Sequence, residues 1–248
     1  MSSLGQRRRV NSTPVSVAVP HYAQTLDFTC GPSSLLMVMK ALEPESAFDR
    51  SLEIRLWKEA TTMFMGGPHH GGSSALGLAL AADRRGFDVE IFVNHDGVLL
   101  GERGRTEDRR EVMRLIHEAD LAEAQARGIP ITYRALGTAE LEERFRAGWL
   151  PIVLVSTRYI HGDHVAHWLV VTGFDGDTVF VNDPWVDRKR GKKPEHMTNL
   201  RIPWADFEAM ARFGRNKERA AVLVRRKDGA HGLRQGAPAP AAELERKR

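Results

Sequence analysis

Two kinds of hydrophobic pattern follow each other along the chain. Up to about residue 148, most apolar residues recur every three or four positions, as on the buried face of a helix. The longest such stretch, residues 106–127, has apolar residues at helical spacing that we expect to be buried: Val112, Leu115, Ile116, Ala119 and Ala122. The elements predicted in this part are helices at 30–40, 51–62, 73–85, 106–127 and 138–147, and strands at 15–19, 89–93 and 131–134.

After Gly148 the pattern becomes that of strands. Apolar runs rich in valine, at 151–156, 167–172 and 178–181, are typical of buried strands. The segment Gly-Phe-Asp-Gly-Asp at 173–177 predicts a hairpin between the last two runs. A further helix is predicted at 204–211 and a last strand at 221–224. Helices followed by a mostly antiparallel sheet predict an α+β protein.

The length and the two ends define the expected domain organisation. The chain has 248 residues, enough for one domain or two tightly packed lobes, and it shows no internal repeat. Its start is polar and rich in arginine, and its end combines alanine, proline and charge, a composition typical of disorder. We expect a flexible N-terminus at 1–13, a folded domain at 14–225 and a disordered basic tail at 226–248.

The basic character of the chain lies in those ends. There are 36 Lys and Arg against 32 Asp and Glu, a net charge of +4 and a pI of about 9.4. Residues 1–9 carry a charge of +3, and residues 225–248, with seven basic and three acidic residues, carry +4. The remainder is therefore mildly acidic, at about −3. This distribution gives no support to a nucleic-acid groove, and no nucleic-acid partner is expected.

The chain contains a single cysteine, Cys30. An intramolecular disulfide is therefore excluded, and a cysteine-based zinc site is not expected. No apolar run approaches the roughly 18 residues of a membrane span, and no apolar segment follows the first arginines as in a signal peptide. We expect a cytoplasmic protein without a membrane partner, and the oligomeric state stays open.

Cys30 lies at the predicted start of a helix, in the sequence Gln-Thr-Leu-Asp-Phe-Thr-Cys-Gly-Pro-Ser from Gln24. The unpaired N–H groups and the dipole of a helix N-terminus stabilise a thiolate, which is the nucleophilic form of cysteine. A lone cysteine is also often a small buried apolar residue. Gln24 favours the catalytic interpretation, because its carboxamide and the Cys30 N–H together supply two donors to an oxyanion.

A cysteine nucleophile needs a base, and the base needs an orienting group. Most of the ten histidines, including His21 and His161, fall in predicted loops, where a solvated role is the default. His167 instead opens a predicted strand, and the hairpin returns the chain beside it at 182–183. Strand alternation separates Asn182 and Asp183 onto opposite faces. We favour Asp183 as the orienting group, with Asn182 as the alternative.

Four residues resemble, in order and spacing, the catalytic residues of the bacteriocin-processing, double-glycine leader peptidases, which are papain-like cysteine peptidases. These residues are Gln24, Cys30, His167 and Asp183. The chain is more similar still to transporter-free bacterial relatives of that family, through F-T-C-G-P-S-S-L, G-L-A-L-A-A-D-R-R-G-F and F-E-A-M-A-R-F-G-R. It contains no ABC-transporter membrane segment and no nucleotide-binding motif. Coupling to export is therefore not implied.

The resemblance implies a papain-like fold, with a helical lobe carrying Cys30 and an antiparallel sheet lobe carrying His167 and Asp183. It implies Cys30 as the nucleophile, His167 as general base and acid, Asp183 as the orienting group and Gln24 in the oxyanion hole. The expected reaction is cleavage of a peptide or amide bond through a thioester on Cys30, without a cofactor or metal. The identity of the substrate is not implied.

Four further residues are candidates for substrate binding. The glycine-rich loop 66–72 ends in Gly71 and Gly72, and glycines leave room for a substrate backbone to approach. Trp168 and Trp185 lie beside His167 and Asp183 in the sequence, where an indole shields a catalytic pair from water. A plain flexible loop and two core tryptophans are the alternative interpretations.

Three other functions stay open. A zinc hydrolase would use the histidines of H-G-D-H-V-A-H, which ends at His167, but spacings of three and six do not bring all three to one side of a strand. An acyl or peptidyl transferase would pass the same thioester to an amine. A non-catalytic peptide-binding protein would use the same fold, although all the catalytic positions are present.

Overall fold

The computed structural model describes residues 13–61, 71–227 and 235–236. Its strands are β1 Val15–Val17, β2 Phe87–Val93, β3 Ile131–Tyr133, β4 Leu150–Ser156, β5 Ala166–Asp175, β6 Thr178–Asn182, β7 Leu200–Pro203, β8 Ala220–Arg226 and β9 Gln235–Gly236. Its helices are α1 Cys30–Leu42, α2 Arg50–Ala60, α3 Ala75–Asp83, α4 Glu107–Ala126, α5 Thr138–Arg146, α6 Arg158–His161 and α7 Trp204–Met210. Three 3₁₀ turns complete these elements: η1 Gly101–Arg103, η2 Arg188–Arg190 and η3 Pro194–Met197.

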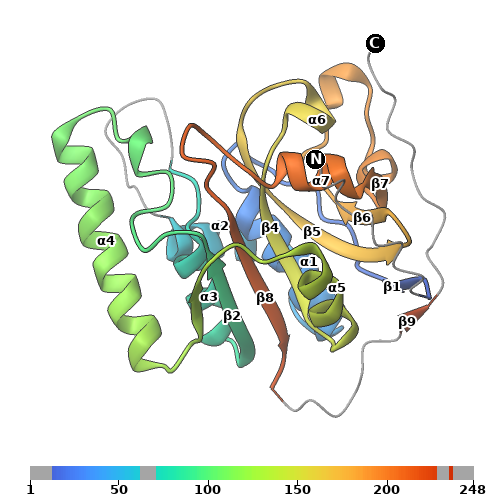
Figure 1. Cartoon of the computed structure of the whole chain (residues 1–248), viewed down its shortest axis with the longest axis horizontal. Helices are drawn as coiled ribbons and strands as arrows, with labels where there is room; N and C mark the ends of the chain where they lie inside the picture. The colour runs from blue at the N-terminus through green and yellow to red at the C-terminus, as the bar shows by residue number, and fades with distance from the viewer. Residues whose placement is uncertain (1–12, 62–70, 228–234, 237–248) are drawn as a thin grey trace, which may run out of the picture.

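The strands form one sheet, in the order β3-β2-β8-β4-β5-β1-β9, with β6 paired to both β5 and β7 (Figure 1). Every pair is antiparallel except β2 with β3. The α+β class predicted from the sequence is confirmed. The expected order, with helices first and the sheet after them, holds only in part. Strands β2 and β3 come from the earlier part of the chain and join the same sheet.

Helices cover both faces of this sheet. In Figure 1, α1 and α3 lie behind it and α5 and α7 lie in front. The central strand β4 is buried along its whole length, which explains its continuous apolar run. Most of α1 is buried too, on all sides, because it packs between the sheet and α2. The helix that begins at Cys30 is therefore a fixed part of the core.

The predicted elements agree with the structure to within a few residues, and three were missed. These are β7, the short helix α6 and the strand β9. The hairpin predicted at 173–177 is present, but β5 continues to Asp175, so that only two residues separate it from β6. The predicted flexible N-terminus and basic tail lie largely outside the described residues; within the tail, β9 pairs with β1.

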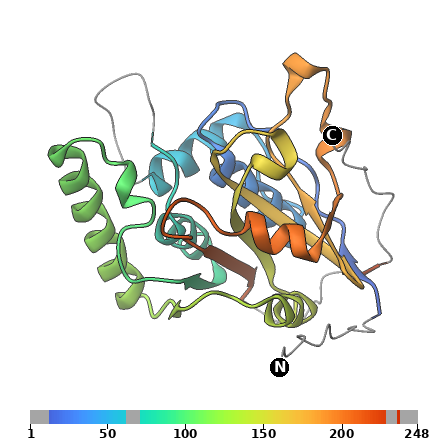
Figure 2. The same ribbon diagram turned by 45° about the horizontal axis from the view of Figure 1, so that its top comes forward.

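The prediction of which side chains of α4 are buried is wrong. Val112 is 39 % exposed and Leu115 is 50 % exposed, whereas the buried side chains of this helix are Met113 and Ala124. The reason is visible in Figures 1 and 2, where α4 stands at one edge of the molecule. Its contacts are mainly with α3 and η1, so a narrow face is covered and the rest meets solvent.

Helices α2 and α3 approach each other closely at Gly77. A Cβ atom added to Gly77 would lie 2.7 Å from the Cα and carbonyl oxygen of Ala60. Backbone atoms cannot yield as a flexible side chain does, so a residue larger than glycine at this position forces the two helices apart.

We expect Gly77→Ala to lower the free energy of unfolding by about 1–3 kcal/mol, because overpacking displaces backbone. Chemical denaturation monitored by circular dichroism measures this. The matched control is Gly137→Ala, where an added Cβ has no neighbour within 4 Å, and its effect should stay below about 1 kcal/mol. Equal effects in the two variants would contradict the close contact.

Candidate active site

Cys30 is the first residue of α1, and 8 % of it is exposed. Thr29 precedes the helix without capping it through its side chain. The side chain of Thr29 therefore accepts no hydrogen bond from the first N–H groups of the helix. These N–H groups place partial positive charge near the thiol. Proline and glycine follow Cys30 directly, which suits the first turn of a helix.

His167 and Asp183 are brought together by the hairpin of β5 and β6. The Nε2 atom of His167 lies 2.7 Å from Oδ1 of Asp183. Both residues are buried, and Asp183 is 0 % exposed. Asn182, the alternative orienting group, faces away: its amide donates to the carbonyl of Val19 at 2.9 Å and its oxygen accepts from the N–H of Asn199.

The charges of these three residues support one another. Burial alone would raise the pKa of Cys30, but the His167 charge, its hydrogen bond and the N–H groups of Trp168 and Gly31 lower it. Burial alone would lower the pKa of His167, but Asp183 and Cys30 raise it to about 10. Burial would also raise the pKa of Asp183, yet His167 and His161 hold it below its usual range. The site therefore favours a thiolate beside an imidazolium.

A cleft of about 550 Å³ opens beside Cys30, a size typical of ligand sites. Gly71, Gly72 and Trp168 line it together with Cys30. Trp185 does not line it; its backbone N–H donates to Oδ1 of Asp183 at 2.8 Å instead. The other part of the predicted glycine loop, 66–70, lies outside the described residues.

Gln24 is held beside the Asp183 segment. Its backbone N–H donates to the carbonyl of Pro184 at 2.9 Å. Its side-chain amide donates to the carbonyl of Leu26 at 2.7 Å, and its Oε1 is buried without a hydrogen-bond partner among the described residues. The carboxamide has two N–H bonds, so one remains for an oxyanion.

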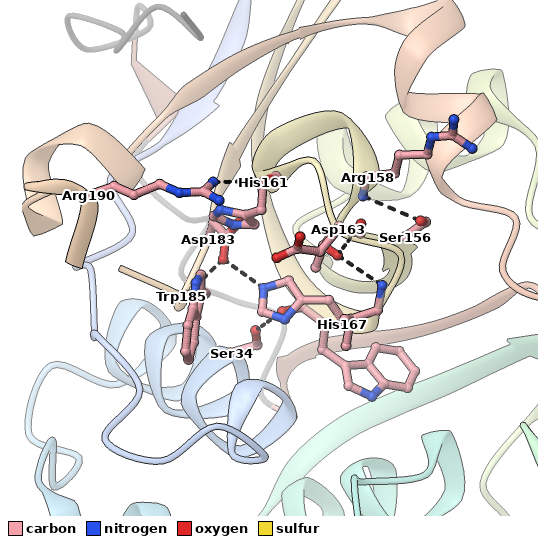
Figure 3. Close-up of polar contacts among 12 residues, drawn as sticks. Ser34, Ser156, Arg158, His161, Asp163, His167, Asp183, Trp185 and Arg190 are labelled. Atoms are coloured by element: carbon pink, nitrogen blue, oxygen red, sulfur yellow. Dashed lines mark hydrogen bonds and ion pairs between the residues drawn. The ribbon is translucent and has the colours of Figure 1, made fainter. Parts of the chain in front are cut away.

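His161 is a residue of the site that the sequence interpretation missed. Its Nε2 lies 2.8 Å from Oδ2 of Asp183, so that Asp183 sits between two imidazole rings (Figure 3). Only 8 % of the His161 side chain is exposed, so the solvated role expected for it is wrong. The signal in the sequence was a histidine six residues before His167, but the helix α6 that turns it inward was not predicted.

His21 was missed in the same way. It is half-buried, and its Nε2 lies 2.8 Å from the backbone carbonyl of Asp183. Burial lowers its pKa, although Asp183 opposes this change. The neutral ring therefore supports the backbone of Asp183, while His161 and His167 hold its carboxylate.

Glu53 of α2 is a buried carboxylate that organises the approach to Cys30. It is 0 % exposed and accepts hydrogen bonds from the hydroxyls of Tyr22, Thr25, Thr29 and Ser33 and from the N–H of Thr25. These donors lie on both sides of Gln24 and Cys30 in the sequence. Glu53 therefore fixes the segment that carries the nucleophile; the signal for it was a charged residue on the buried stripe of α2.

The histidines considered for zinc are used otherwise. His161 and His167 bind Asp183, and Nδ1 of His164 lies 2.9 Å from Oγ of Ser156. Across the described ranges, no three or more His, Cys, Asp or Glu side chains are grouped so that they could hold a metal ion.

The site therefore combines a buried Cys, His and Asp in an α+β fold, with the Cys lining a cleft. This combination is typical of sites whose chemistry depends on a thiol. The chain belongs to the Peptidase_C39 like family, whose model matches residues 19–225. This match confirms the resemblance inferred from the motifs. No curated protein matches the chain in sequence.

Three solved structures are similar to the chain. The peptidase domain of Streptococcus ComA, a bi-functional ABC transporter, is 16 % identical over 83 % of this chain and 97 % of that chain, with a TM-score of 0.41. A putative C39-like peptidase from Bacillus anthracis is 14 % identical over 87 % and 99 %, with a TM-score of 0.48. A double glycine motif protease from an AMS/PCAT transporter, in complex with the leader peptide, is 15 % identical over 87 % and 100 %, with a TM-score of 0.41.

No helix within the described part of the chain has both the length and the apolar character that crossing a membrane requires.

We expect His161→Ala to lower the free energy of unfolding by about 1–3 kcal/mol at pH 7, because Oδ2 of the buried Asp183 loses its donor. A carboxyl with a lowered pKa stabilises the fold above its unfolded pKa and loses this contribution as the pH falls. The difference from the wild type should therefore shrink in acid. The change is expected below about pH 4, where the aspartates of the unfolded chain become protonated, and urea unfolding between pH 2 and pH 7 measures it.

The matched control for that experiment is His164→Ala, in the same connection between β4 and β5 but hydrogen-bonded to Ser156. The difference in free energy of unfolding between this variant and the wild type should not become smaller in acid. A His161→Gln variant keeps one N–H donor and should retain part of the stability. A pH-independent loss in His161→Ala would contradict a role through Asp183.

We expect Glu53→Ala to destabilise the protein by at least about 3 kcal/mol, because several buried donors lose their acceptor together. The control is Glu59→Ala on the same helix, whose partly exposed carboxylate pairs with Arg85 at 2.7 Å. That loss should stay near or below about 1 kcal/mol. Equal losses, measured by thermal or chemical unfolding, would show that Glu53 does not organise this segment.

Proposed function

We propose that this protein is a papain-like cysteine hydrolase that cleaves a peptide or amide bond through a thioester on Cys30. The observation that carries the proposal is the coupling of a buried thiol to the His167–Asp183 pair, at a cleft large enough for a peptide. Membership of the Peptidase_C39 like family supports it. The cytoplasm stays the predicted compartment.

The proposed catalytic residues come from two parts of the fold. The helical part supplies Cys30 from the start of α1, and the sheet supplies His167 from β5 and Asp183 after β6. These positions support the proposal of a papain-like fold, in which a helical lobe and a sheet lobe would meet at the cleft. The Nε2 atom of His167 is bonded to Asp183, so Nδ1 is the ring nitrogen that serves Cys30.

In the first half of the reaction, the Cys30 thiolate attacks the carbonyl carbon of the scissile amide. The oxygen becomes an oxyanion, held by the Cys30 N–H and the second N–H of the Gln24 side chain. The tetrahedral intermediate then collapses: the C–N bond breaks, His167 donates its proton to the leaving amine, and a thioester remains on Cys30.

In the second half, neutral His167 takes a proton from water, and the resulting hydroxide attacks the thioester carbonyl. The C–S bond breaks, the carboxylic acid leaves, and the thiolate and imidazolium are restored. Asp183 keeps the ring oriented and stabilises its charge throughout. A peptidyl transferase would differ only here, with an amine in place of water, so the product released from the thioester distinguishes the two reactions.

We expect Cys30→Ala and His167→Ala to abolish turnover of a cleaved peptide, and Gln24→Ala to lower it by about 10²–10³-fold through the loss of one oxyanion donor. Digestion of a peptide library followed by mass spectrometry measures the first, and initial rates on one selected peptide measure the second. Full activity in Cys30→Ala would overturn the mechanism. Binding without cleavage by the wild type would indicate a peptide-binding protein.

We expect the thiolate to persist well below the ordinary cysteine pKa of about 8.5. The absorbance difference at 240 nm between the wild type and Cys30→Ser measures it during a pH titration. In His167→Ala the attraction is lost while burial remains, so the pKa of Cys30 should rise above its ordinary range. Turnover should also fall in alkali around pH 10, as His167 loses the proton that it must donate. An ordinary thiol titration in the wild type would contradict the ion pair.

A further inference from the structure

The cleft beside Cys30 has an uneven distribution of charge. Its wall at η1 and the start of α4 contributes Arg103, Arg105 and Arg109. The floor of the cleft is apolar and includes Leu154 and Trp168. Residues 10–224 as a whole carry a net charge of about −3. The three arginines on one wall are therefore a local feature and do not follow from the overall composition.

Two of these arginines, Arg103 and Arg105, lack among the described residues the carboxylate partners that neutralise arginines of α4. Arg110 pairs with Glu107 at 2.8 Å, and Arg114 pairs with both Glu111 and Glu118. In contrast, Arg103 and Arg105 are exposed, and within the described ranges neither forms an ion pair. The guanidinium of Arg103 lies over the ring of Phe213, 5.6 Å from its centroid, and this contact leaves its N–H groups unpaired with any carboxylate of that part of the chain.

The acidic residue of the same wall does not compensate for them. Glu102 directs its carboxylate toward Gly214, since a Cβ added to Gly214 would lie 2.9 Å from Oε1 of Glu102. The other acid that lines the cleft, Asp27, comes from the segment before Cys30. The positive charge of the cleft is thus gathered near η1, and Asp27 belongs to the segment before the nucleophile.

We propose that the substrate is an acidic peptide, whose aspartate or glutamate side chain binds Arg103 and Arg105 while its scissile carbonyl lies at Cys30. The inference rests on the proposed function and adds the substrate class to it. Guanidinium groups bind carboxylates through two parallel hydrogen bonds, which selects for acids over their amides. The apolar floor takes the rest of the peptide.

Protection of Cys30 from iodoacetamide tests this without requiring turnover. Cys30 is the only cysteine, so the mass of the intact protein reports its alkylation directly. One pool of decapeptides contains two glutamates at varied positions among Gly, Ala, Ser and Leu, and the matched pool contains two glutamines instead. We expect the acidic pool to protect Cys30 at concentrations about threefold to tenfold lower than the amide pool.

Three forms of the full chain are compared: the wild type, Arg103→Gln with Arg105→Gln, and Arg226→Gln. Arg226 is an exposed arginine of β8 that does not line the cleft. The preference for the acidic pool should disappear in the double variant and persist in Arg226→Gln. Equal protection by the two pools, protection by neither, or a preference that survives in the double variant would overturn the proposal.

Turnover is followed separately in the same mixtures. If the acidic pool protects Cys30 selectively and no peptide is cleaved, hydrolysis fails as the function while recognition of acidic peptides stands. If peptides are cleaved without any preference for glutamate, hydrolysis stands and the substrate class is wrong.

Discussion

The structure depends on keeping a charged carboxylate, Asp183, fully buried. An unpaired carboxylate in such a position would cost several kcal/mol, so it needs partners on both oxygens. His167 and the N–H of Trp185 bind one oxygen, and His161 binds the other. Once satisfied in this way, Asp183 holds the imidazolium of His167, and the imidazolium in turn stabilises the Cys30 thiolate. The lowered pKa of the thiol is thus a consequence of how a buried charge is accommodated.

The remainder of the fold holds these groups at fixed distances. The β5–β6 hairpin sets the spacing of His167 and Asp183, and α6 turns His161 inward from the connection between β4 and β5. Among the helices, the buried Glu53 fixes the segment from Tyr22 to Ser33 against α2. Two buried carboxylates therefore do most of the positioning, Asp183 through histidines and Glu53 mainly through neutral hydroxyls.

Local patterns predicted much of this arrangement. The start of α1 at Cys30 followed from its helix periodicity and Pro32, and the proximity of His167 and Asp183 followed from strand alternation and a hairpin. The stripe of α4 could not be predicted, because a helix at the edge of a molecule is covered on a face that its own sequence does not determine. His161 and Glu53 were missed for a related reason: their partners lie 22 and 20–31 residues away along the chain, and pairing at such distances is visible only in the fold.

The protonation state of His167 shows directly whether the ion pair with Cys30 exists. Nitrogen-15 NMR of the imidazole rings, with His167 assigned through its loss in His167→Ala, distinguishes an imidazolium from either neutral tautomer. We expect both ring nitrogens of His167 to carry protons at pH 8 and the ring to become neutral only around pH 10. A neutral His167 ring at pH 8, with an ordinary thiol at Cys30, would contradict this expectation.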